Sequence, residues 1–447
     1  MQRNARRIAR GTRWPDYRAI WRWHFYAGLL CLPLVCWLAC TGAIYLFRPQ
    51  IEAWLDRPYA NIVTSNESLL APSAEVQAAL DAFPGATLHA YQLPASGAAA
   101  PQLLIGRGDT EWRIWLHPMS GQVLKAAPED ERLMNVIFSL HGELLLGNRG
   151  SMLVELAASW AIVLVLTGLV LWWPRGASRL GGLVYPRFCL GRTIFWRDLH
   201  AVAGLWMSLP VLFLLVSGLP WAANWGAYLD ELRQLSGQVT SRRDWPVGNV
   251  PAPGMVPVVS RPLTEGDYAA VDRVVAAASG MHLDWPVLVS PPEGAGADWT
   301  VRSDTQDRPR REVVLIDGRT GTVVARSGFN QQDWVDRAVA VAVAAHEGQL
   351  FGWPNQAAGL LTAVLLLMAS VSAGVHWWLR RPHGVLGALQ PIVQPRFVGW
   401  LVGVIVLLGL MLPLFGLSLV AVLATERLVL TRLPASRRWL GLRARVG

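Results

Sequence analysis

The sequence predicts a mainly α-helical membrane protein built as a tandem duplication, and three observations lead to this class. Hydrophobic residues make up 53% of the 447 residues, which is more than a soluble chain of this length ordinarily carries. Five apolar segments are each long enough to cross a hydrocarbon core of ~30 Å. The two halves of the chain also carry the same residues at the same spacing.

The expected order is span, small α+β domain, span, repeated once and followed by a fifth span. We expect a basic N-terminus at 1–23, a span at 24–47, a first domain at 48–151, a span at 152–173, a basic loop at 174–199, a span at 200–222, a second domain at 223–354, a span at 355–379, a basic loop at 380–396, a span at 397–423 and a basic tail at 424–447. The first span is expected to be retained, because it is longer than the apolar core of a signal peptide.

The two polar segments share one pattern. Each begins with a helical stretch and a possible N-cap, which is Ser73 in the first segment and Thr264 in the second. Each ends with a strand, a turn and a strand, in "IWLHPMSGQVL" at 114–124 and "VVLIDGRTGTVV" at 313–324. The first of these hairpins lacks an aspartate equivalent to Asp317.

The net charge of +9 comes almost entirely from arginine. The arginines gather before the first span, between the second and third, and after the fourth, so the positive-inside rule places these regions in the cytoplasm. Segments 48–151 and 223–354 then face the periplasm of a bacterium, and the protein lies in the inner membrane with its N-terminus inside. Since the basic patches orient helices, a nucleic-acid partner is not expected.

The last span is the exception to this rule. A single helix over 397–423, kinked at Pro413, would leave the basic tail outside. A hairpin at Pro413 would return the tail to the cytoplasm, but its arms would be only about 15 and 10 residues, short of the ~20 that a span needs. We therefore expect the single kinked helix.

The odd spans repeat one motif. Residues 24–42 and 200–218 both begin with histidine, His24 and His200, and both carry Gly-Leu four and five residues later and glycine eighteen residues later. The even spans repeat another. "HGELLLG" at 141–147 matches "HEGQLFG" at 346–352, and Trp-Trp follows each histidine after thirty-one residues.

A parallel duplication brings equivalent residues of its halves face to face about an axis along the membrane normal. His24 should therefore approach His200 near the cytoplasmic face, and His141 should approach His346 near the periplasmic face. Paired neutral imidazoles in a membrane indicate two b-type haems with two axial histidines each. The glycines four residues after His24 and His200 would leave room for a flat macrocycle. Beyond haem iron, no metal site is expected.

Other readings of these histidines stay open. A single histidine at a helix end is more often an interfacial residue than a ligand. Zinc is the rival metal, but the outer pair has no cysteine and only Glu143 and Glu347 as close acids, and the inner pair has only Asp198. His376 has no counterpart in the first half, so it could replace one member of the inner pair or sit at the interface beside the following Trp-Trp. Glu143 and Glu347 are either neighbours that orient the outer imidazoles, contacts for a cationic substrate, or solvated. The remaining histidines, which we expect on the surface, are His89, His117, His282 and His383.

The chain resembles the PepSY-associated transmembrane family, which includes bacterial iron-regulated membrane proteins and siderophore-iron reductases. The resemblance covers residues 21 to about 423 and lies in "WHFYAGLL", "DLHAVAGLW", "SLHGELLLG", "AAHEGQLFG", "TGLVLWWPR", "AGVHWWLRRP" and the "DGRTGTVV" type of hairpin. It implies periplasmic PepSY domains and an inner-membrane dihaem protein that passes electrons from the cytoplasm to a periplasmic ferric siderophore or other ferric chelate. No nicotinamide-binding motif is evident, so the electron donor is another protein, such as a flavoprotein, or a quinol.

Two other classes of function compete with this one. A non-catalytic regulator would use the PepSY domains to bind or inhibit a periplasmic peptidase, and it would not need the histidine pairs. A transporter is disfavoured, because the spans contain almost no paired charge.

Overall fold

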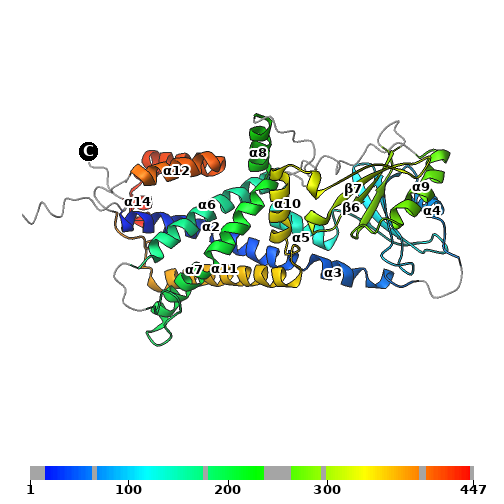
Figure 1. Ribbon diagram of the computed structural model, residues 1–447. Coiled ribbons are helices and arrows are strands. Elements are labelled where there is room, and N and C mark those ends of the chain that lie inside the picture. Colours follow the sequence, from blue (N-terminus) through cyan, green and yellow to red (C-terminus); the bar gives the residue numbers. More distant parts are fainter. Residues whose placement is uncertain are drawn as a thin grey trace, which may run out of the picture. The chain divides into compact units, whose positions relative to one another are not determined.

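The computed structural model describes residues 16–62, 68–174, 180–235, 263–292, 298–391 and 399–442 (Figure 1). The chain forms two compact units. We call them the helical unit, which contains residues 1–42, 148–225 and 360–447, and the sheet unit, which contains residues 43–147 and 226–359.

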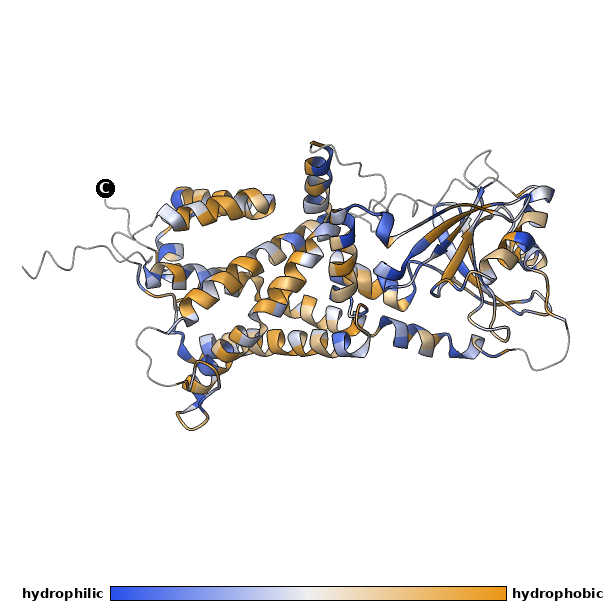
Figure 2. Ribbon diagram, in the orientation of Figure 1, coloured by the Kyte–Doolittle hydropathy of each residue, from blue (hydrophilic) through white to orange (hydrophobic). Residues whose placement is uncertain are grey.

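Long apolar helices dominate the helical unit (Figure 2). They are α2 (Tyr17–Tyr45), α6 (Asn148–Trp172), α7 (Arg192–Gly218) with the 3-10 turn η2 (Leu219–Trp221), α11 (Trp353–Arg380), α12 (Gly399–Met411), α13 (Pro413–Thr425) with the π-turn η5 (Glu426–Leu430), and the short α14 (Pro434–Leu440). Among the described residues, five stretches are long and apolar enough to cross a membrane: Tyr17–Tyr45, Asn148–Trp172, Arg192–Trp221, Trp353–Arg380 and Pro413–Leu430. The prediction of a multi-pass membrane protein is therefore confirmed, and its first four spans lie on these helices.

Glu155 of α6 is a buried acid within an apolar span, and its hydrogen bonds explain how it is accommodated. Its side chain accepts hydrogen bonds from the backbone N–H groups of Asn224 and Trp225, at 3.2 Å and 3.1 Å. These groups open helix α8 (Ala223–Leu235), whose first turn has no intrahelical acceptors. The carboxylate therefore acts as a cap for a neighbouring helix.

The prediction of a single kinked helix over 397–423 is wrong. A Cβ on Gly416 would lie 2.8 Å from the carbonyl oxygen of Gly409, whereas residues seven apart in one continuous helix are separated by ~10 Å. Helices α12 and α13 therefore fold back on each other. The break falls at Leu412, which precedes Pro413 and is restricted away from helical backbone angles. The second arm of the hairpin is long enough to cross a membrane, because the helical path of α13 continues through η5 to Leu430.

The hairpin also decides where the basic tail lies in the helical unit. The indole of Trp225 donates to the carbonyl of Met411 at 2.9 Å, at the end of the unit where α8 begins. The hydroxyl of Tyr26 donates to the carbonyl of Leu440, at the end where α2 begins. The chain from 411 to 440 therefore returns to the end of the unit that carries Arg18 and Arg22, and the conflict with the positive-inside rule disappears.

This topology predicts that the N-terminus and the C-terminus face the same compartment. Green fluorescent protein fused after Gly447 should fluoresce in the cytoplasm, and alkaline phosphatase at the same point should be inactive, because the tail arginines resist translocation. A truncated fusion after Gln50, beyond α2, is the control and should give the reverse pattern. An active phosphatase after Gly447 would contradict the hairpin.

The sheet unit has eight strands and several short helices. Its first half contains α3 (Arg48–Leu55), η1 (Arg57–Tyr59), α4 (Pro72–Ala82), β1 (Thr87–Gln92), β2 (Gln102–Arg107), β3 (Thr110–Leu116), β4 (Val123–Pro128) and α5 (Leu133–Gly142). Its second half contains α9 (Glu265–Ser279), β5 (Val287–Ser290), β6 (Asp298–Ser303), η3 (Arg308–Arg310), β7 (Glu312–Asp317), β8 (Val323–Gly328), η4 (Phe329–Gln331) and α10 (Trp334–His346).

The strands form one antiparallel sheet rather than two separate sheets. Their order is β4-β3-β2-β1-β5-β6-β7-β8, so β1 and β5 join the halves through the pairs Tyr91 with Val289 and Gln92 with Leu288. Helices α4 and α9 pack on one face and bury a common apolar core (Figure 1). The two predicted α+β domains therefore share a sheet and a core.

The two closing hairpins have the same turn despite their different first residues. In the second, Asp317 accepts a side-chain hydrogen bond from the backbone of Arg319 at 2.7 Å. In the first, Nδ1 of His117 accepts from the backbone of Met119 at 3.3 Å. Gly121 occupies the positive-φ position in the first turn, with φ of 70°. His117 thus replaces the missing aspartate and is a turn residue rather than a solvated one.

The predicted N-caps differ in outcome. Thr264 caps α9 in a capping box with Asp267, whose carboxylate accepts from the backbone N–H of Thr264 at 2.7 Å. Ser73 is not a cap, because α4 already begins at Pro72. Its backbone N–H and hydroxyl instead donate to Asp272 of α9, at 2.8 Å and 2.7 Å. The carboxylate of Asp272, in the other half of the sheet unit, therefore accepts hydrogen bonds from the first turn of α4.

A buried carboxyl in the core of the sheet unit makes its stability depend on pH. Glu75 is 4% exposed, and its side chain accepts a hydrogen bond from the hydroxyl of Tyr91 at 2.7 Å. Burial raises the pKa of Glu75 to about 7. The unfolded chain releases this proton near pH 4.5 and the folded chain keeps it, so stability falls by about 3 kcal/mol as pH rises from 4.5 to 7.

Replacing Glu75→Gln should remove this loss, because the amide stays neutral and still accepts from Tyr91. We expect the variant to unfold several degrees above the wild type at pH 8 and at nearly the same temperature at pH 4.5, as followed by tryptophan fluorescence. A difference that does not change with pH would contradict the assignment.

Candidate paired-histidine sites

The structure brings His24 of α2 and His200 of α7 together in the helical unit. Their ring centroids are 6.2 Å apart, and the ring planes make an angle of 64°. Both rings are half-buried among apolar helices. We call these two residues the inner pair.

Hydrogen bonds fix which nitrogen of each inner ring carries the proton. Nδ1 of His200 lies 2.9 Å from the carbonyl oxygen of Ala369, which only accepts, so Nδ1 is the donor. Nδ1 of His24 lies 3.0 Å from the hydroxyl of Thr167. That hydroxyl donates to the carbonyl of Val163 at 2.7 Å, so it accepts from the ring. In both neutral rings, therefore, Nε2 carries the lone pair and is available as a ligand.

Small residues leave space around the inner pair. A Cβ on Gly168 would lie 3.2 Å from Cε1 of His24, so a larger residue would push against this ring. A Cβ on Gly204 would meet no atom within 4 Å, and one on Gly28 would meet only Leu164 at 3.7 Å. Glycine inside a helix costs ~1 kcal/mol relative to alanine. Open space beside glycines next to two ligand-capable rings fits a flat bound group.

The structure does not place His376 in the inner pair. Its Nδ1 lies 3.2 Å from the carbonyl oxygen of Thr193. Thr193 precedes His200 by seven residues on α7, and His376 follows Ala369 by seven residues on α11. The two helices therefore run antiparallel with two cross-bonds that are two turns apart, which is ~10 Å along the axis.

The structure also brings together His141 of α5 and His346 of α10, which we call the outer pair, in the sheet unit. His141 lies in the last turn of α5, and His346 is the last residue of α10. Their ring centroids are 6.5 Å apart with an angle of 77° between the planes. Both rings thus sit at helix C-termini, where the negative end of the macrodipole favours a bound cation. The loops that follow are matched as well, since Gly147 and Gly352 both have positive φ, 58° and 62°.

Both separations suit two imidazoles on opposite sides of one metal. A metal–imidazole bond is ~2 Å long and the ring centroid lies about 1 Å behind the bound nitrogen, so such centroids are about 6 Å apart. The described residues contain no group of three or more His, Cys, Asp or Glu that could hold a metal ion. The protein therefore offers two donors per site, which fits a metal that brings its own equatorial ligands and does not fit tetrahedral zinc.

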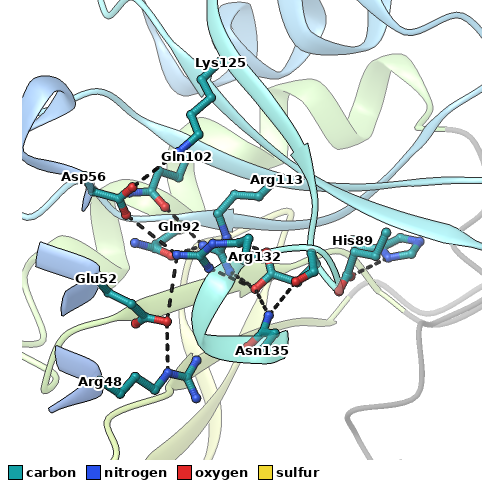
Figure 3. Close-up of polar contacts among 12 residues, drawn as sticks. Arg48, Glu52, Asp56, His89, Gln92, Gln102, Arg113, Lys125, Arg132 and Asn135 are labelled. Carbon is teal, nitrogen blue, oxygen red and sulfur yellow. Dashed lines mark hydrogen bonds and ion pairs between the residues drawn. The ribbon is translucent and has the colours of Figure 1, made fainter. Parts of the chain in front are cut away.

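A network of charges holds the helix of His141 (Figure 3). Glu129 accepts two hydrogen bonds from Arg113 of β3, at 2.8 Å and 3.1 Å. It also accepts from Arg132 at 3.0 Å and from Asn135 at 3.2 Å, both at the start of α5. We call these four residues the Glu129 clamp. It ties the first turn of α5 to the sheet, and His141 follows two turns later.

The clamp extends to α3 and to the only lysine of the chain (Figure 3). Arg132 lies 3.7 Å from Asp56, and Lys125 lies 3.9 Å from the same carboxylate. The ammonium of Lys125 also stands 4.4 Å from the ring centroid of Trp115, which is fully buried. Cation–π contacts of this kind hold a charged side chain against the sheet.

The helix of His346 is held by a different pair of buried charges. Asp336, in the first turn of α10, faces Arg233 of α8 at 2.9 Å, and both side chains are almost fully buried. At the other end of α10, Glu347 is 6% exposed and lies 3.8 Å from Arg308. Surface solvation of Glu347, one of the expected readings, is therefore wrong. Glu143 follows α5 in a partly buried position, and burial raises its pKa.

Of the remaining histidines, His89 also departs from expectation. Its Nδ1 lies 2.8 Å from Glu111, and a Cβ on Gly106 would overlap its ring. It is thus packed on the neighbouring strand. His282 and His383 are exposed, as expected.

Sequence reasoning missed the hydroxyls that serve the inner pair, although the repeat contains a signal for them. Thr167 and Ser372 both lie twenty-six residues after the outer histidine of their half. Thr167 accepts from His24, and Ser372 donates at 3.0 Å to the carbonyl of Ala369, which also accepts from His200. A hydroxyl repeated inside an apolar span was the available clue.

The family model of the PepSY-associated TM region matches residues 21–381. The chain belongs to this family. The matched range contains all five candidate histidines of this PepSY-associated protein, whereas the α12–α13 hairpin lies beyond it. No curated protein matches the sequence.

The Glu129 clamp predicts loss of stability in acid. Burial alone would raise the pKa of Glu129, but the charges and hydrogen bonds of Arg113 and Arg132 outweigh it and hold the pKa at about 2. The unfolded carboxyl titrates near pH 4.5, so the stabilisation is present above that pH and is lost as pH falls from 4.5 to 2. The full loss is about 3 kcal/mol.

Glu129→Gln should therefore free the start of α5 at neutral pH. We expect amide hydrogen exchange in residues 133–142 to speed up by about a hundredfold, since breaking a buried pair costs about 3 kcal/mol. Glu312→Gln is the matched control, because its partner Arg326 is 56% exposed, so little change is expected there. Equal effects of the two changes would contradict the clamp.

Proposed function

We propose that this PepSY-associated protein is a dihaem b-type redox protein of the bacterial inner membrane. It would pass electrons from the cytoplasmic side to a ferric siderophore or other ferric chelate in the periplasm, in the service of iron acquisition. The observation that carries the proposal is the pair of imidazole couples with centroids 6.2 Å and 6.5 Å apart. The bonds that leave Nε2 of His24 and His200 available support it.

The residues present would hold one haem at His24 and His200 and one at His141 and His346. A bound haem supplies reversible one-electron transfer between its ferric and ferrous states. Two histidines from two different helices would hold each haem, which favours electron transfer over binding of small gases at the iron. Thr167 and the carbonyl of Ala369 hold the inner rings in the required tautomer. The Glu129 clamp and the Arg233–Asp336 pair hold the helices of the outer rings.

We also propose that the two halves arose by tandem duplication and that the PepSY sheet faces the periplasm. Equal offsets support the duplication, since 205 residues separate His141 from His346, Thr167 from Ser372 and Trp172 from Trp377. Each half of the sheet unit also has a helix followed by four antiparallel strands. The arginines near the opposite ends of the spans support the orientation.

The electron donor would be a flavoprotein or a quinol, and the product would be Fe(II), which chelators of Fe(III) hold weakly. The competing function, a regulator that binds a periplasmic peptidase, does not need ring pairs at ligation distance. It would also not explain why a ring acceptor, Thr167, and two small residues, Gly168 and Gly204, lie around the inner pair.

Haem content tests the proposal directly. Protein purified from a haem-replete host should show a Soret band and about two haems per chain by the pyridine haemochrome assay. His24→Ala with His200→Ala should remove one haem, and His141→Ala with His346→Ala should remove the other, because each iron loses both axial ligands.

His282→Ala with His383→Ala is the matched control, since both of these histidines are exposed. It should keep both haems. Wild-type protein without a Soret band, or a band that survives all four ligand changes, would reject the redox function and favour the regulator.

A further inference from the structure

His376 is a titratable side chain at the inner end of the bundle that the ring pairs do not use. Its cross-bond to Thr193 lies two turns from the bond between His200 and Ala369, so His376 stands ~10 Å along the helices from the inner pair. A group bound at His376 would be close enough to exchange electrons with a cofactor held by His24 and His200.

The hydrogen bond to Thr193 fixes the chemistry of the His376 ring. A backbone carbonyl only accepts, so Nδ1 donates, and Nε2 carries the lone pair of the neutral ring. Nε2 has no hydrogen-bond partner among the residues that the structure describes, and the ring is half-buried. The free nitrogen is therefore suited to accept a hydrogen bond from a hydroxyl group of a ligand.

The residues next to His376 indicate that such a ligand would reach the site from the lipid bilayer. Trp377 and Trp378 follow directly, and the guanidinium of Arg381 stands 5.1 Å and 4.1 Å from their ring centroids. Tryptophans covered by arginine at the end of an apolar span mark the boundary between hydrocarbon and headgroups. A ligand that reaches this level from the bilayer has an apolar body and a polar head.

The charges that act on His376 are basic groups on two helices. They are Arg197 on α7 and Arg380 on α11. Positive charge at this point stabilises an oxygen that becomes anionic when it gives up a proton. The same charge repels an ammonium group, and a carboxylate has no proton to donate to Nε2, so a phenolic hydroxyl suits this position best.

We propose that His376 binds the hydroxyl of a membrane-dissolved hydroquinone and accepts its proton, so that the hydroquinone is the electron donor of the inner pair. This inference rests on the proposed function. Oxidation of one hydroquinone to the quinone releases two protons and two electrons. The proton of the hydroxyl at Nε2 passes to His376 and then to water, and the second proton goes to water. The two electrons would pass one at a time to the haem that His24 and His200 would hold, which is the electron acceptor of this oxidation.

Stopped-flow reduction in nanodiscs tests the proposal, with decyl-hydroquinone as the donor and dithionite as a donor that needs no site. His376→Gln should slow reduction by decyl-hydroquinone about a hundredfold, which is the contribution of a positioned proton acceptor. It should also flatten the pH profile of that rate. Reduction by dithionite, the haem content and the Soret band should stay unchanged. His383→Gln, an exposed histidine seven residues further on, is the matched control and should behave as the wild type.

A binding measurement separates this inference from the haem proposal. Quenching of tryptophan fluorescence by decyl-hydroquinone should give a dissociation constant about tenfold higher in His376→Leu, as for one lost hydrogen bond, because leucine offers no acceptor to the hydroxyl. It can be read in protein with or without haem, so absence of haem rejects the redox function while the site is still tested.

Three results would overturn the inference. The first is a rate of reduction by decyl-hydroquinone in His376→Gln equal to that of the wild type, together with equal binding of decyl-hydroquinone by His376→Leu and wild type. The second is a changed haem content or Soret band in His376→Gln, which would make His376 an axial ligand. The third is wild-type protein that a reduced flavoprotein reduces and decyl-hydroquinone does not.

Discussion

An imidazole placed among apolar helices must find an acceptor for its one N–H group, and the arrangement of the helical unit follows from this requirement. An unsatisfied polar group costs several kcal/mol in such surroundings. The ring of His200 uses the carbonyl of Ala369, and the ring of His24 uses the hydroxyl of Thr167. These two bonds fix the register of α7 against α11 and of α2 against α6. They also leave the second nitrogen of each ring without a proton.

The two rings of the outer pair are held at a similar separation, and salt bridges position their helices. Its histidines end short helices that begin against polar surfaces of the sheet unit, so charged groups can hold them at an acceptable desolvation cost. Arg113 and Glu129 hold the start of α5, and Arg233 and Asp336 hold the start of α10. Hydrogen bonds to a hydroxyl and to a backbone carbonyl thus position the rings of the inner pair, whereas salt bridges position the helices of the outer pair.

The sequence was enough to predict the four main spans and which histidines come together, because a repeated motif with fixed spacing carries spatial information when the halves share one fold. It was not enough for contacts that lie between elements. The α12–α13 hairpin was missed because arm length was counted in apolar residues, while the helical path continues past Glu426. The single sheet was missed because β1 and β5 meet through only two residue pairs. The role of His117 was missed because an imidazole replaces a carboxylate in the turn.

The junction between β1 and β5 has a consequence for the proposed duplication of the chain. A half-length protein with four strands would leave β1 as an open border of its sheet, with unpaired backbone groups along Tyr91 and Gln92. Association of two such halves would cover both borders and would also supply the second histidine of each couple. Linking the halves in one polypeptide would turn that encounter from a concentration-dependent event into a permanent one.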